Sequence, residues 1–153
     1  MDYMEALKIV LAGTVGTLGF SLLFKSNPQR TLFNALGGTI TCIVYVICCE
    51  VFDHEFMQNF FPALAATAYA EIMARLLKAP ATPILACSII PLVPGGKLYY
   101  TTYYFVVGQM GLFKYTLTQT LRIAAGLAVG IIVISVIVNE VNSHKFKAIL
   151  DID

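Results

Sequence analysis

The residues best suited to chemistry in this 153-residue chain form one run, PLVPGGK, at positions 91–97. Pro91 and Pro94 lack a backbone N–H and their rings clash with the preceding turn, so an uninterrupted helix cannot pass through them. The two glycines that follow accept backbone conformations that other residues avoid. A helix restarting here offers unpaired amides and the positive end of its macrodipole, beside the Lys97 ammonium. The run therefore predicts a site for a carboxylate or another anion.

The alternative for this run is a plain turn at the membrane surface, with Lys97 in water. Broken helices bind substrates through their free ends in several transporter folds. A break at membrane depth is tolerated only where it packs against protein or lines a wet cavity. The depth of the break therefore distinguishes a substrate site from a turn.

Four tyrosines follow the glycines, at positions 99, 100, 103 and 104. At about 100° per residue they cover less than half of a helix circumference. Such a face suits a wet pathway, in which Tyr100 and Tyr103 would contact substrate. It equally suits the aromatic belt at a membrane interface, which is the commoner use of tyrosine.

Glu71 and Arg75 are four residues apart and so share one helix face. Ionisable groups inside a span usually face a cavity or one another. Glu71 is a candidate for relaying protons or balancing a substrate ammonium. The alternative is a structural ion pair near the lipid headgroups. The candidate substrate-binding residues are thus Pro91, Pro94, Gly95, Gly96, Lys97, Tyr100, Tyr103, Glu71 and Arg75.

Catalysis is not indicated by any motif. His54 and His144 fall in predicted loops without partners at motif spacing, and no serine-hydrolase, zinc-protease or phosphate-loop pattern occurs. The four cysteines lie in apolar runs without metal-ligand spacing, which is typical of small buried side chains. We expect no enzyme, no cofactor and no metal.

Composition places these residues in a membrane protein. The chain is 58% hydrophobic and 12% charged, against about 25% charged residues in soluble domains. Its net charge of +1 gives no field that would attract nucleic acid. We predict one all-α transmembrane domain over residues 1–153, with about five segments, because about 20 residues cross the hydrocarbon core. The predicted spans are residues 4–24, 32–51, 58–77, 83–110, broken at Pro91–Gly96, and 118–138.

The broken segment is longer than one straight crossing needs. Thr82 before Pro83 predicts an N-cap with proline at the first helical position. A first helix would run over residues 83–90, and a second would restart near Gly95 and end near Met110. The pair is either one kinked span or a re-entrant hairpin.

Small residues recur along the other spans and predict close helix packing. The first span has glycines at positions 13, 16 and 19, and the third has alanines at positions 63, 66, 70 and 74. Gly126 and Gly130 form a GxxxG pair in the last span. This pair is a weak dimerisation signal, because the motif also serves packing inside a bundle.

The positive-inside rule predicts the orientation. Lys25 and Arg30 place the first loop in the cytoplasm and hence the N-terminus outside. The acidic second loop, with Glu50, Asp53 and Glu55, is outside. If the broken segment crosses once, Lys145 and Lys147 place the C-terminus in the cytoplasm. If it is re-entrant, the tail is outside. The charge bias favours the crossing.

The motifs P-A-T-P at 80–83 and I-I-P-L-V-P-G-G at 89–96 resemble those of the threonine/serine exporter family. The glycine-rich first span, the N-P-x-R turn at 27–30 and the span ending in Glu-x-x-x-Arg are similar to its small, separately encoded subunit. The resemblance covers residues 5–138. Lys97 does not belong to the family pattern, so its role rests on its chemistry alone.

This resemblance implies a plasma (inner) membrane exporter of small metabolites: threonine and serine, or dicarboxylates such as succinate in two-subunit relatives. It also implies a larger partner subunit carrying an additional N-terminal half, and a homo-oligomer is a further expectation. Two alternatives remain open from the residues. One is an interaction subunit that stabilises a partner without transporting, and the other is a small oligomeric channel.

Overall fold

The computed structural model describes residues 3–24 and 28–150, and every regular element in that part of the chain is helical. In chain order the helices are α1 (Tyr3–Leu23), α2 (Pro28–Val51), α3 (Glu55–Leu76), α4 (Ala81–Ile89), the short 3₁₀ helix η1 (Ile90–Leu92), α5 (Gly95–Val106) and α6 (Met110–Leu150). The predicted all-α class is confirmed.

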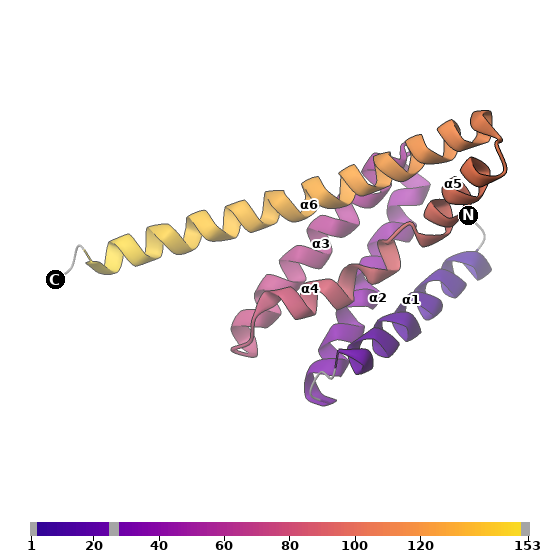
Figure 1. The fold of residues 1–153 in the computed structure, drawn as a ribbon. Helices are drawn as coiled ribbons and strands as arrows, with labels where there is room; N and C mark the ends of the chain where they lie inside the picture. The colour runs from indigo at the N-terminus through magenta and orange to yellow at the C-terminus, as the bar shows by residue number, and fades with distance from the viewer. Residues whose placement is uncertain (1–2, 25–27, 151–153) are drawn as a thin grey trace.

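The helices form a bundle with α3 near its centre (Figure 1). α3 packs against α2, α4 and α6, while α1 packs against α2 and η1. α5 lies along the first part of α6. With 41 residues at about 1.5 Å each, α6 is about 60 Å long. Its C-terminal end projects beyond the other helices (Figure 1).

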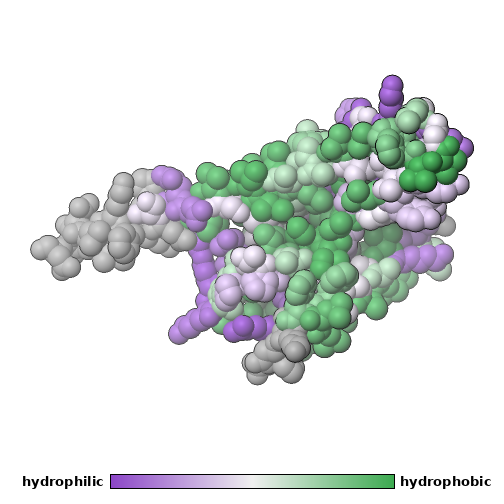
Figure 2. All heavy atoms as spheres, in the orientation of Figure 1, coloured by the Kyte–Doolittle hydropathy of each residue, from purple (hydrophilic) through white to green (hydrophobic). Residues whose placement is uncertain are grey.

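The surface is that of a membrane protein. On the face shown in Figure 2, apolar residues form a broad band, and hydrophilic residues gather toward the ends of the bundle. Among the described residues, three helices are long and apolar enough to cross a membrane: α1, α2 over Arg30–Val51, and α6 over Met110–Val141. The bent pair formed by α4, η1 and α5 makes a fourth. The predicted count of about five is therefore approximate. α3 falls short of the hydropathy that this criterion needs because of its charged and amide side chains, although it runs beside α6 through the bundle.

Several helices differ in extent from the predicted spans and segments. α6 begins at Met110, whereas the last span was expected at 118, and α5 ends at Val106 rather than near Met110. α6 also continues through the expected polar tail to Leu150. Of the predicted N-P-x-R turn, position 27 lies outside the described residues, and positions 28–30 are the first residues of α2.

Thr82 does not cap α4, contrary to the prediction. The N-cap is Pro80, with φ −63° and ψ 140°, and no side chain caps the helix. Thr82 and Pro83 therefore lie inside the first turn. Pro83 is tolerated there because the first amides of a helix have no intrahelical acceptor to lose.

Buried small residues bring the helices together, as predicted for α3. Its alanines at positions 63, 66, 70 and 74 are all buried. The glycine stripe of α1 is confirmed only in part. A Cβ on Gly13 would collide with the Cys42 Sγ of α2, whereas Gly16 and Gly19 have open space around them. Gly37 and Gly38 of α2 make the other close contacts, against Ser88 and Thr17.

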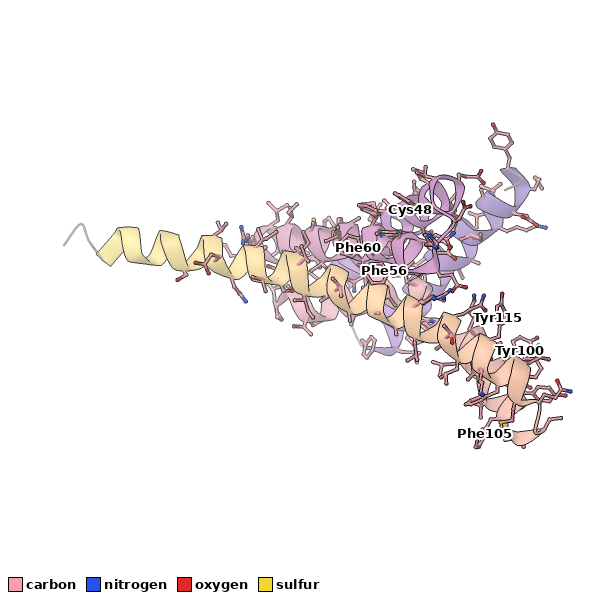
Figure 3. All side chains as sticks on the ribbon, turned by 90° about the horizontal axis from the view of Figure 1, so that it is seen from above. Cys48, Phe56, Phe60, Tyr100, Phe105 and Tyr115 are labelled. Carbon is pink, nitrogen blue, oxygen red and sulfur yellow. The ribbon has the colours of Figure 1, made fainter. Side chains whose placement is uncertain are left out.

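The GxxxG pair packs inside the bundle. A Cβ on Gly126 would lie 2.5 Å from the carbonyl oxygen of Phe56, and one on Gly130 would lie 2.7 Å from that of Phe60. Phe56 and Phe60 lie beneath α6 in Figure 3. The two glycines therefore allow α6 to rest on the backbone of α3, and this use accounts for the motif without a dimer.

Candidate functional site

The predicted helix break is present; Leu92 is buried in the bundle, whereas Val93, Gly95 and Gly96 are exposed. α4 ends at Ile89, η1 follows, and α5 starts at Gly95 after a bend of 58°. Pro91 packs against α1 beside Gly13, because a Cβ on that glycine would be 3.4 Å from the Pro91 Cβ. Gly13 is the central residue of α1, ten residues from Tyr3 and ten from Leu23. The break therefore lies level with the middle of a candidate span, where broken backbone requires protein or a cavity around it.

The break has protein on one side, where Pro91 packs against α1, and a cavity of about 510 Å³ on another. This volume is within the usual range of about 300–1,000 Å³ for small-molecule sites. The cavity extends from the middle of α1 toward the end of the bundle where α1 begins and α3 begins. The break supplies residues 91–97, and the other helices supply Ile9, Ala12, Gly13, Cys42, Tyr45, Asn59 and Ile123.

The restarted helix exposes fewer free amides than expected. The Gly95 N–H donates to the carbonyl oxygen of Val93 at 2.7 Å, and the Leu98 N–H donates to that of Pro94 at 2.9 Å. No side chain caps the helix. The amides of Gly96 and Lys97 are thus the two that lack an intrahelical acceptor. Both residues line the cavity.

Neither glycine of the break is crowded. An added Cβ on Gly95 or Gly96 would meet no atom within 4 Å, and neither residue has a positive φ. These glycines therefore keep the cavity open next to the free amides. They are not required by backbone strain.

Lys97 is paired with a carboxylate that sequence reasoning assigned to a loop. Its Nζ donates to Glu55 Oε1 at 2.6 Å, and Glu55 is the first residue of α3. The Lys97 side chain is 38% exposed and that of Glu55 is 17% exposed. The two residues are 42 positions apart and belong to no common motif, so only the packed structure brings them together.

Glu55 has unused hydrogen-bonding capacity. Its Oε2 is buried and has no hydrogen-bond partner among the described residues. One turn further along α3, the Asn59 Nδ2 donates to the backbone oxygen of Glu55 at 2.8 Å. Asn59 is itself buried and lines the cavity. The site therefore combines a cation, two free amides and an incompletely satisfied carboxylate.

The tyrosines of α5 are placed outside the cavity. Tyr100 and Tyr103 are 53% and 47% exposed and are not among its lining residues. Rings of neighbouring tyrosines contact one another, with centroids 5.4 Å apart for Tyr99 and Tyr100. Figure 3 shows Tyr100 near Tyr115 at the far end of the α5–α6 hairpin, away from Phe56 and Phe60. This placement fits the aromatic-belt alternative.

Glu71 and Arg75 are also remote from the cavity. Glu71 is sixteen residues after Glu55, which is about 24 Å along α3. Neither residue lines the cavity. Their predicted role in substrate binding stays a prediction that would require a different conformation or a second site.

Metal-ligating side chains form no binding cluster in the described part of the chain. No group of three or more His, Cys, Asp or Glu side chains there could hold a metal ion. The four cysteines are free thiols, three of them buried. The polar residues that line the cavity are Lys97, Asn59 and Tyr45, and none of these three is a carboxylate, an imidazole or a thiol.

These features define a class: an all-α, multi-pass membrane protein whose fourth helix is broken level with the middle of α1, beside a mainly apolar cavity that contains a few polar groups. Comparison with protein families then gives the affiliation. Residues 9–137 match the model of the family described as Threonine/Serine exporter, ThrE, so the chain belongs to the threonine/serine exporter family, which is a family of transporters. Comparison with curated proteins and with solved structures gave no match.

Proposed function

We propose that the chain is the membrane subunit of an exporter that moves small carboxylate-bearing metabolites out of the cytoplasm. Threonine and serine, or dicarboxylates such as succinate, are its proposed cargo. The observation that carries the proposal is the cavity beside the mid-depth break, where the Gly96 and Lys97 amides and the Lys97 ammonium lie together. Family membership supports the transporter class. No enzyme activity is part of the proposal.

The proposed binding mode uses the restarted helix as an anion site. A substrate carboxylate would accept hydrogen bonds from the two free amides of α5, at the positive end of its macrodipole. Lys97 would add a charge-assisted hydrogen bond, about twice as strong as a neutral one. The glycines leave room for the rest of the substrate in the cavity.

We propose a single transmembrane domain in the plasma (inner) membrane, with the N-terminus outside and the C-terminus in the cytoplasm. Arg30, Arg75 and Lys78 lie toward the end of the bundle where α1 meets α2 and α3 meets α4, which is the cytoplasmic end by the positive-inside rule. α6 runs parallel to α3, because Gly126 and Gly130 contact Phe56 and Phe60 in the same order, and so ends on that side. The 58° bend supports one kinked crossing, since a re-entrant hairpin would reverse the chain. The cavity would then open outward.

A larger partner subunit completes the proposal. α6 presents large exposed apolar side chains along its length, from Met110 to Val141, and little of its apolar window is buried. Part of that surface would face lipid, and part is available to a partner or a second copy. The same surface also favours the alternative of an interaction subunit that transports nothing itself.

Efflux measurements separate these possibilities. Cells loaded with labelled threonine or succinate would be compared with and without the chain, and with and without the larger partner subunit. The proposal predicts faster efflux only when both are present. Efflux that the partner alone supports at the full rate would favour the interaction subunit. Transport by the purified chain alone in liposomes would contradict the need for a partner, and a voltage-clamped conductance would identify a channel.

A further inference from the structure

We propose that Glu55 is the residue that recognises the ammonium group of the substrate, so that the Lys97–Glu55 pair selects zwitterionic α-amino acids over dicarboxylates. The inference rests on the proposed function, because it concerns the same cavity. It assigns a specificity-determining role to a residue that neither the sequence motifs nor the helix break contains.

The geometry supplies two opposite charges in contact beside the cavity: Lys97 lines it, and Glu55, which is not itself a lining residue, contacts the Lys97 ammonium. The Lys97 Nζ lies 2.6 Å from Glu55 Oε1. The other carboxylate oxygen of Glu55 is buried without a hydrogen-bond partner among the described residues. A buried acceptor left in this state costs free energy that a new donor would recover. An ammonium has three donors, so it can satisfy oxygens that Lys97 leaves unmet.

A zwitterion can exchange the internal ion pair for two external ones. Its carboxylate would take the place of Glu55 at Lys97 and at the free amides of Gly96 and Lys97. Its ammonium would take the place of Lys97 at Glu55. No charge is left unpaired in the partly buried site, which is the condition under which separating such a pair is tolerable.

A dicarboxylate cannot make this exchange. One carboxylate could reach Lys97 and the free amides, but Glu55 would then lose its cation and face added negative charge. Uncompensated or like charges in a desolvated site are strongly unfavourable. A monocarboxylate that has no ammonium group would likewise take Lys97 from Glu55 without giving Glu55 a new cation. The pair thus rejects anions by repulsion as well as attracting zwitterions.

The test measures the affinity added by the ammonium group. The full chain in lipid nanodiscs would be titrated calorimetrically with L-threonine, with 3-hydroxybutyrate, which is threonine without the amino group, and with succinate. The variants are Glu55→Gln and the double variant Glu55→Gln/Lys97→Met, which leaves no unpaired charge if the single variant fails to fold. Asp53→Asn is the matched control, because Asp53 is an exposed carboxylate two residues away.

We expect the wild-type chain to bind threonine at least about tenfold more tightly than 3-hydroxybutyrate, which is the value of one charge-assisted hydrogen bond. Glu55→Gln should bring that ratio close to one and should leave succinate binding unchanged or stronger. The double variant should also lose the ratio, and the Asp53→Asn control should keep it.

A purely structural ion pair predicts a different pattern. Glu55→Gln, or the double variant, could instead weaken the binding of all three ligands equally and keep the ratio of threonine to 3-hydroxybutyrate affinity. Glu55 would then have only a structural role. That result would overturn the inference and leave the proposed function standing. If the wild-type chain bound none of the three, and an excess of threonine left its unfolding temperature unchanged, the proposed function itself would fail.

Discussion

Pro91 packs against Gly13, and this contact sets the depth at which the fourth helix is broken. Because Gly13 is the midpoint of α1, the break cannot be a turn at the end of that helix. The glycine is needed because a Cβ there would strike the Cys42 Sγ of α2, while it would meet the Pro91 Cβ at 3.4 Å, an ordinary contact distance. The cavity, the free amides and the Lys97–Glu55 pair all follow from the position of this break.

Gly13→Ala should destabilise the protein by about 1–3 kcal/mol, which is the usual cost of overpacking a close contact. Thermal unfolding in detergent measures the effect. Gly19→Ala on the same helix is the matched control, because nothing lies within 4 Å of its added Cβ. Adding Cys42→Ala to Gly13→Ala should restore part of the loss. Equal unfolding temperatures for Gly13→Ala and Gly19→Ala would contradict the close packing.

Gly130→Val should weaken the folded chain itself and leave its oligomeric state unchanged. The added side chain would meet the Phe60 carbonyl oxygen at 2.7 Å, and backbone atoms cannot move aside cheaply. We expect a loss of about 1–3 kcal/mol. Unfolding temperature and native mass spectrometry, with Gly111→Val of the same helix as control, check both parts. A dimer that dissociates in Gly130→Val without loss of stability would show that the GxxxG pair is an oligomer contact.

Lys78→Gly should stabilise the protein by about 1 kcal/mol. α3 and α5 end alike: the amides of Lys78 and Ala79 return to the carbonyl oxygens of Arg75 and Ala74, and those of Gly108 and Gln109 return to Phe105 and Tyr104. The first residue of each pair has a positive φ, 48° for Lys78 and 77° for Gly108. Side chains disfavour this conformation by about 1–2 kcal/mol, and glycine does not.

The reciprocal change, Gly108→Lys, should destabilise by a similar amount. Thermal unfolding of both variants gives the comparison. An increase in stability from Gly108→Lys, or a decrease from Lys78→Gly, would contradict the assigned helix ends.

Val93→Cys should react with a membrane-impermeant thiol reagent added from outside the cell, and threonine should slow the reaction. Val93 is 51% exposed and lines the cavity that we propose opens outward. The wild-type chain is the control, since three of its four cysteines are buried. Labelling of Val93→Cys only from the cytoplasmic side would reverse the proposed orientation.

The helical class and the broken fourth segment could be predicted from the sequence because they follow from local chemistry. Long apolar runs indicate helices that lie in lipid. Pro91 and Pro94 lack the backbone N–H groups that a continuous helix needs. The boundaries were less predictable. The start of α6 at Met110 depends on the glycine turn at Gly108, which allows α5 and α6 to pack as a hairpin.

The site could be predicted only in part. The types and spacing of Lys97 and the two glycines predicted a site at the helix break, and these residues do line a cavity. Glu55 could not be found this way, because its pairing with Lys97 spans 42 residues and depends on how α5 passes the start of α3. Glu71 was the more conspicuous acid in the sequence, but it lies twelve residues along α3 from Asn59, the α3 residue that lines this cavity.

The most direct test of the account is threonine efflux by the Gly96→Leu variant. A Cβ added at Gly96 meets no atom within 4 Å and Gly96 lines the cavity, so we expect leucine there to fold normally and to take up space beside the two free amides. Gly111→Leu is the control, since it adds the same side chain in open space outside the cavity. With equal amounts of both variants in the membrane and the partner subunit present, we predict that Gly96→Leu abolishes efflux and Gly111→Leu retains it. Normal threonine efflux by Gly96→Leu would contradict the claim that the broken helix holds the substrate.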